Sequence, residues 1–194
     1  MLIAARAALL DALDALVEQR DALVLIGAQA IYLHTGAAVV ALAEATKDSD
    51  LAVDDHERMT ITALDPDDRR SVEIAVAGPA ALLVSKLHKL AERKDDPGRL
   101  IDKDAHDIYR LLVATYATEP GTRLAELSTD SLAGPATTAA TEHLRDLFSD
   151  PGALGPVMAG RAEQLVGDPD VVAAAAAALA GDLITTLDPN RFNG

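Results

Sequence analysis

Cysteine and tryptophan are missing from this 194-residue chain, and aromatic residues make up only 3% of it. Without thiols there is no disulfide, no thiolate-bound zinc and no cysteine nucleophile. Hydrophobic residues still make up 49% of the sequence, so we expect an aliphatic, alanine-rich core. Charges at helical spacing over residues 1–20 predict an amphipathic helix and no signal peptide, and the alanine run 173–178 is too short to cross a bilayer. We expect a cytoplasmic protein without a membrane span.

Basic residues are scarce: 17 Lys and Arg stand against 31 Asp and Glu, for a net charge of −14. This balance argues against indiscriminate nucleic-acid binding, which depends on neutralising phosphates. The basic residues are nevertheless crowded between Lys86 and Arg110, which favours a local contact with phosphate over a solvated helix pair. The acidic remainder suits a basic protein partner.

Two carboxylates one residue apart, Asp48 and Asp50, are the most informative feature that is present. In an extended strand, side chains at i and i+2 point to the same face, so both acids project together. Paired carboxylates repel unless a cation lies between them, and Mg²⁺ prefers carboxylate oxygens and substrate phosphates. A strand over 47–53 would therefore present a magnesium site suited to nucleotidyl or phosphoryl transfer, although Asp-x-Asp also occurs in solvated turns.

A phosphate-binding turn is predicted upstream of this pair. The apolar run 22–26 is typical of a buried strand, Gly27 ends it, and residues 28–34 favour a helix. A helix N-terminus after such a turn exposes backbone N–H groups to phosphate, although a plain strand-to-helix turn would need the same glycine.

Two helices predicted downstream carry further charged candidates. Pro79 begins the first, whose body runs over 80–93, and Lys86 falls among its leucines. Such a lysine either reaches out of the core along its surface or points into a cleft. In the second helix, over 102–112, Asp104 lies on the arc that should be buried and Asp107 at its edge, although an acid this early can also cap the helix.

Taken in order, these segments resemble a known family. Gly-Ala-x-Ala-Ile-x-x-His-x-Gly, Thr-x-Asp-x-Asp-Leu, Lys-Leu-His-x-Leu and Lys-Asp-x-x-Asp-Ile-Tyr-x-Leu-Leu, spread over 23–112, are similar to the AbiEii/MenT-type nucleotidyltransferases, which are toxins with a DNA polymerase β-like fold. The resemblance implies an Mg²⁺-dependent enzyme that adds nucleotides from an NTP to RNA, with the tRNA 3′ end as acceptor, and a cognate antitoxin as partner.

The resemblance also implies roles for single residues. Asp48 and Asp50 would hold Mg²⁺, Lys86 would contact the triphosphate with Lys89 as its alternative, and the pair Asp104 and Asp107 would supply the last acidic motif. Nucleotide contacts are expected at Gly27, Thr46, Lys47 and Lys89. Thr46 shares the strand face of the two acids, so a phosphate there should repel the triphosphate, although strand propensity alone also explains a threonine.

The chain departs from the family pattern after Val53. Only residues 54–58 separate the acidic strand from Met59, and the third carboxylate expected on a neighbouring strand has Glu73 as its one candidate. A strand cut short at Val53 suggests that a segment is absent from this chain, with a shortened member as the alternative.

The fold class expected is α+β, with a small mixed sheet as nucleotidyltransferase core, an N-terminal helix and a C-terminal helical bundle. Further strands are expected near 60–64 and 72–76. Residues 118–121 should end the Asp104 helix, which gives a core over 1–118 and a helical region over 119–194, with helices at 135–147, 156–166 and 169–187. Two other functions fit: a degenerate nucleotidyltransferase fold that only binds, and an antibiotic-modifying nucleotidyltransferase.

Overall fold

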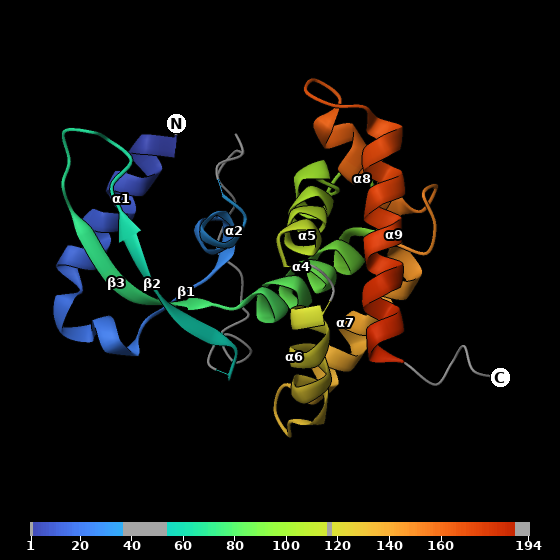
Figure 1. Ribbon diagram of the computed structural model, residues 1–194, viewed down its shortest axis with the longest axis horizontal. Coiled ribbons are helices and arrows are strands. Elements are labelled where there is room, and N and C mark those ends of the chain that lie inside the picture. The colour runs from blue at the N-terminus through green and yellow to red at the C-terminus, as the bar shows by residue number, and fades with distance from the viewer. Residues whose placement is uncertain (1, 37–53, 116–117, 189–194) are drawn as a thin grey trace. The chain divides into compact units, whose positions relative to one another are not determined.

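A computed structural model describes residues 2–36, 54–115 and 118–188 (Figure 1). The chain divides into two compact units, Met1–Leu82 and Leu83–Gly194. The expected boundary at 118–119 differs from this division and lies inside the second unit. The physical reason is that α5 (Asp102–Thr115), expected to belong with the sheet, packs against the C-terminal helices, chiefly α8 (Leu154–Glu163).

The first unit contains a small mixed sheet. Its strands are β1 (Val24–Leu25), β2 (His56–Thr62) and β3 (Ser71–Ala77), in the order β1-β3-β2. Central β3 runs parallel to β1 and antiparallel to β2. Val72, Ile74 and Val76 are buried while Ser71 and Glu73 are exposed, because alternate side chains of a strand point to opposite faces. The α+β class and the mixed sheet are confirmed, and the nucleotidyltransferase core stays a prediction.

The helices and strands of the first unit lie where the sequence predicted them, but they begin and end at different residues. The amphipathic helix expected over 1–20 is α1 (Leu2–Ala15), followed by a 3-10 helix, η1 (Val17–Ala22). The strand expected at 22–26 is reduced to the two residues that pair with β3. Helix α2 (Gly27–Thr35) begins at the glycine itself, and the strand expected near 60–64 begins earlier, at His56.

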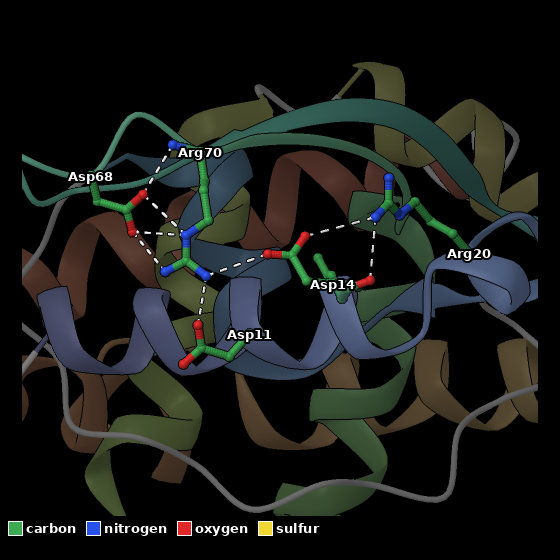
Figure 2. A network of polar contacts seen from close by, with 6 residues as sticks. Asp11, Asp14, Arg20, Asp68 and Arg70 are labelled. Atoms are coloured by element: carbon green, nitrogen blue, oxygen red, sulfur yellow. Dashed lines mark hydrogen bonds and ion pairs between the residues drawn. The ribbon is translucent and has the colours of Figure 1, made fainter.

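Arg70, at the approach to β3, ties α1 to the turn between β2 and β3 (Figure 2). Its guanidinium bonds Asp68 at 2.7 Å and reaches Asp11 of α1 at 2.5 Å. Asp14 extends the network from Arg70 toward Arg20 of η1. The hydrogen bonds that Arg70 donates to Asp68 and Asp11 raise the pKa of Arg70 above its usual value. These contacts fasten the N-terminal helix at the surface, while Leu10 and Leu13 anchor it in the core.

Helix α4 (Pro79–Arg93) begins where Asp55 caps it. The Asp55 carboxylate accepts a hydrogen bond from the N–H of Ala81 at 2.8 Å, and the N–H of Gly78 donates to the Asp55 carbonyl at 2.7 Å. A Cβ on Gly78 would lie 2.4 Å from the Asp55 carboxylate, so any larger residue would have to displace this cap. The helix start predicted from Pro79 is confirmed.

The second unit is helical. Besides α5 and α8 it contains α6 (Thr118–Thr129), α7 (Gly134–Leu147) and α9 (Pro169–Leu187). Aliphatic side chains with Phe148 and Met158 form its core. The Asp104 helix ends before residues 118–121, as expected, and these residues begin a new helix: Pro120 lies in the first turn of α6, where no intrahelical N–H bond is lost.

The later helix starts were predicted more closely. Helix α9 has the expected bounds, and the side chain of Asp168 accepts hydrogen bonds from the N–H groups of Asp170 and Val171. By length and composition α9 could cross a membrane, which for a single helix is weak evidence. Ala176, Ala180 and Leu183 are fully buried where α9 packs on its neighbours α5 to α8.

Candidate functional site

Lys86 is a charged residue inside the core of the second unit. On α4 it shares the helix face of Leu83, Leu87 and Leu90, all of which are buried, because residues three and four apart lie on one side of a helix. Its side chain is only 5% exposed. The side chain therefore points inward and does not reach out of the core along its surface.

Two carboxylates on α5 receive the Lys86 ammonium. The Nζ atom of Lys86 lies 3.0 Å from Oδ1 of Asp104 and 2.8 Å from Oδ2 of Asp107. Both aspartate side chains are at most 3% exposed. Because α5 places residues three apart on adjacent turns, the two acids reach one ammonium from the same side. The structure thus brings three of the candidate site residues together, and their roles stay predictions.

Three more cations surround this pair of acids. Lys89 Nζ lies 3.2 Å from Asp104 Oδ1, and Arg93 Nη1 lies 3.0 Å from Asp104 Oδ2. Lys103 Nζ lies 2.6 Å from Asp107 Oδ2. We call these six residues the α4–α5 ion cluster: Lys86, Lys89, Arg93, Lys103, Asp104 and Asp107. Four cations against two carboxylates leave an excess of two positive charges within the cluster.

Burial and the neighbouring charges shift the pKa values of these residues in opposite directions. Burial works to lower the pKa of Lys86, but Asp107 and Asp104 outweigh it and hold the pKa above its usual value. Burial works to raise the pKa of Asp104, but Lys86 and Lys89 hold that pKa below its usual value. For Lys103 burial prevails, and its pKa is lowered despite Asp107. The cluster therefore holds Lys86 and Asp104 firmly charged, whereas Lys103 is held less favourably.

The oxygens of Asp104 and Asp107 do not fit a metal ion. Both oxygens of Asp104 and Oδ2 of Asp107 contact ammonium or guanidinium groups, which would repel Mg²⁺. Within residues 2–36, 54–115 and 118–188, no three His, Asp or Glu side chains gather as a metal site would require. The predicted magnesium ligands, Asp48 and Asp50, lie outside the described residues, as do Thr46 and Lys47.

Gly27 is the first residue of α2, and the turn into this helix requires a glycine. Its φ of +72° lies in the left-handed region that favours glycine, and a Cβ there would meet no atom within 4 Å. The helix is preceded by Ile26, whose side chain cannot cap it. The geometry expected of a phosphate-binding turn is present, although phosphate binding itself stays a prediction.

Glu73 does not gain support as a third carboxylate. It lies exposed on β3, with Oε1 3.7 Å from Nε of Arg58. The basic residues that extend from the ion cluster are also paired in part: Lys94 bonds Asp146 and Arg99 bonds Glu92.

Sequence reasoning missed two buried polar residues. His106 of α5 lies 2.5 Å from Glu163 of α8, and Arg6 of α1 is buried against α2 and β2. Their partners are distant in sequence, so no local pattern indicates the contacts. The one available signal was position, since both residues follow the buried spacing of their helices.

Comparisons with known proteins give no family for this chain. No family model, no curated protein and no solved structure matches it.

Proposed function

We propose that this protein is a Mg²⁺-dependent nucleotidyltransferase that transfers a nucleotide from an NTP to an RNA acceptor, the tRNA 3′ end. The observation that carries the proposal is the α4–α5 ion cluster, in which four cations, none more than 18% exposed, face only two carboxylates. A partly buried excess of cations is stabilised by a bound polyanion. The order of the four sequence motifs supports a triphosphate as that anion.

The chemistry follows from the residues that the proposal assigns. The acceptor hydroxyl attacks the α-phosphorus, the bond to the β-phosphate oxygen breaks, and pyrophosphate leaves with that electron pair. Mg²⁺ held by Asp48 and Asp50 would supply charge neutralisation on the phosphates. Lys89, Arg93 and Lys103 have donors left over after pairing, and these would neutralise the triphosphate oxygens.

Lys86 has a different role in this proposal. Its ammonium is already shared between Asp104 and Asp107, so it holds the two carboxylates in place instead of contacting the triphosphate. We therefore assign Lys86 as a positioning residue and Lys89 as the phosphate contact. Lys86 and Lys103 both engage Oδ2 of Asp107, so we assign its other oxygen, Oδ1, as the atom that accepts the proton of the acceptor hydroxyl.

The biological setting belongs to the same proposal. Modification of the tRNA 3′ end blocks aminoacylation and so stops translation, which makes such an enzyme a toxin in the cytoplasm. A cognate antitoxin protein would restrain it, and the net charge of −14 suits a basic partner.

The test is incorporation of radiolabelled nucleotide. The purified chain is incubated with Mg²⁺, bulk tRNA and each NTP in turn, and the RNA is resolved on a gel. We expect labelled tRNA with at least one NTP, and loss of label in Asp48→Asn with an unchanged circular dichroism spectrum. Equal label in Asp48→Asn would remove the metal assignment. Absence of label with every NTP, together with tight NTP binding, would favour a binding module, and label on an aminoglycoside would favour antibiotic modification.

A further inference from the structure

The turn between α8 and α9 exposes large hydrophobic side chains at one end of the second unit (Figure 1). Leu165 is 91% exposed and Val166 is 83% exposed, which makes them the two most exposed large hydrophobic residues in the described part of the chain. Val171, in the first turn of α9, is 64% exposed. Turns usually carry polar residues, glycine or proline, and an apolar residue just past a helix end often packs back on that helix. We call these three residues the α8–α9 patch.

The backbone beneath the α8–α9 patch is held in place. The N–H groups of Val166 and Gly167 both donate to the carbonyl oxygen of Glu163, each at 2.8 Å. The two helices also approach closely next to the turn, since a Cβ on Gly160 would lie 2.4 Å from the carbonyl oxygen of Pro169. The apolar side chains are therefore presented by a preformed turn, which lowers the entropic cost of binding a partner.

The surroundings of the α8–α9 patch are acidic. Every charged side chain between residues 162 and 188 is an aspartate or a glutamate. Two of them, Asp168 and Asp170, stand in the sequence between the exposed residues Val166 and Val171. The base that precedes the turn, Arg161, already bonds Asp102 at 2.7 Å. Exposed apolar surface and negative charge thus occur together at this end of the unit.

Charge decides which occupant fits the α8–α9 patch. A second copy related by a twofold axis would place the patch against itself, and the paired Asp168 and Asp170 side chains would repel one another. The anionic surface of a membrane would repel the same acids, and α9 is already packed in the helical unit through Ala176 and Ala180. A protein segment that carries lysine or arginine beside apolar side chains matches both features of the patch.

We propose that the α8–α9 patch is a docking surface for a basic amphipathic segment of another protein. Apolar side chains of the partner cover Leu165, Val166 and Val171, and its lysine or arginine side chains pair with Asp168 and Asp170. The docking surface goes beyond the proposed function and does not depend on it, because none of these residues belongs to the α4–α5 ion cluster.

The probe is a fluorescently labelled peptide of leucine and lysine, spaced to form an amphipathic helix, and a matched peptide carries glutamate in place of lysine. Binding to the full-length protein is measured by fluorescence anisotropy. We expect the lysine peptide to bind, with an affinity that falls as salt is added, and the glutamate peptide not to bind. In ¹⁵N-labelled protein, the backbone amide signals of Leu165, Val166 and Val171 should shift with the lysine peptide.

The variant that tests the apolar contact combines Leu165→Ser and Val166→Ser. Both side chains are exposed, so we expect an unchanged unfolding midpoint and a peptide affinity lower by about tenfold or more. Asp170→Asn should lower the affinity by roughly two- to fivefold and reduce its dependence on salt. Leu132→Ser, which removes a leucine that is 67% exposed in the turn before α7, is the matched control and should bind as the wild type does.

Three kinds of result would overturn the docking surface. The first is absence of binding by the lysine peptide, or equal affinity in the double variant and in Leu132→Ser. The second is a lower unfolding midpoint in the double variant, which would assign Leu165 and Val166 to packing. The third is another occupant: self-association in sedimentation, or flotation with phosphatidylcholine–phosphatidylglycerol vesicles, that the double variant loses. None of these measurements depends on nucleotide transfer.

Discussion

Lys86 and Lys89 lie one turn apart on the same helix, yet their replacement should affect stability to different extents. Lys86→Met removes an ammonium that is 5% exposed and bonds two buried carboxylates. Lys89→Met removes an ammonium that is 13% exposed and bonds Asp104 alone, at 3.2 Å. We expect Lys86→Met to lower stability strongly with loss of function, and Lys89→Met to lower function with little loss of stability.

The magnitude for Lys86→Met follows from what remains around the acids. Breaking a buried ion pair usually costs about 3–5 kcal/mol, because the partner is left charged and uncompensated. Here Asp104 retains Lys89 and Arg93, and Asp107 retains Lys103, so the cost should be about 2–4 kcal/mol. For a chain of this size that lowers the unfolding midpoint by roughly 5–15 °C.

Lys89→Met should cost about 1 kcal/mol or less, because Asp104 keeps two other cations. Urea unfolding at pH 7, followed by circular dichroism, measures both variants. Binding of an NTP measured by calorimetry should weaken in Lys89→Met. Lys94→Met, which removes an exposed lysine paired with Asp146, is the matched control and should leave the unfolding curve and NTP binding unchanged. Equal destabilisation by Lys86→Met and Lys89→Met would refute the assignment of different roles.

Three further predictions concern stability. The pKa of Asp104 is depressed in the folded protein, so its carboxylate stabilises the fold above the unfolded-state pKa near 4, and this stabilisation is lost as the pH falls through the lower folded-state pKa. Asp104→Asn should therefore be less stable than the wild type at pH 7. Its free energy of unfolding, measured with urea, should fall less steeply below pH 4. Gly78→Ala should destabilise by about 1–2 kcal/mol because it displaces the Asp55 cap, and Asp55→Ala in the same background should add little. Gly160→Ala places a Cβ 2.4 Å from the backbone carbonyl oxygen of Pro169, so α8 and α9 must move apart and the thermal unfolding midpoint followed by circular dichroism should fall by several degrees.

The elements predicted well from the sequence are those with a local physical signal. The leucine spacing around Lys86 and the proline at position 79 predicted α4, and the Asp168-Pro169 pair predicted the start of α9 at the correct residue. The helix that begins at 118–121 was not predicted, because the local signal there is ambiguous. Proline and glycine end one helix or begin another, and the local sequence does not say which; the packing of α6 against α7 and α9 decides it.

In the candidate site, too, residues with a local sequence signal were predicted and contacts between distant residues were not. Helical periodicity was enough to place Lys86, Asp104 and Asp107 on faces that could meet, because each position follows from residues within one turn. The hydrogen-bond partners of Arg6 were not predictable in this way, although its position follows the buried spacing of Leu10 and Leu13. Its partners Gln29 and Thr62 come from other elements, 23 and 56 residues away, and no spacing in α1 indicates them.

A buried ionic cluster is poor evidence for a purely structural role, and this bears on the proposed function. Well-packed apolar residues of similar volume stabilise a core as well as a buried ion pair does, and often better. Stability alone would also be served by equal numbers of acids and bases, whereas Asp104 and Asp107 are outnumbered by their cationic partners. Burial lowers the pKa of Lys103, and the nearby charge of Lys86 adds to that effect, so this ammonium is held in its charged form at a cost. A bound triphosphate would remove that cost, so the imbalance of charge, rather than the ion pairs themselves, is the feature that favours a binding site.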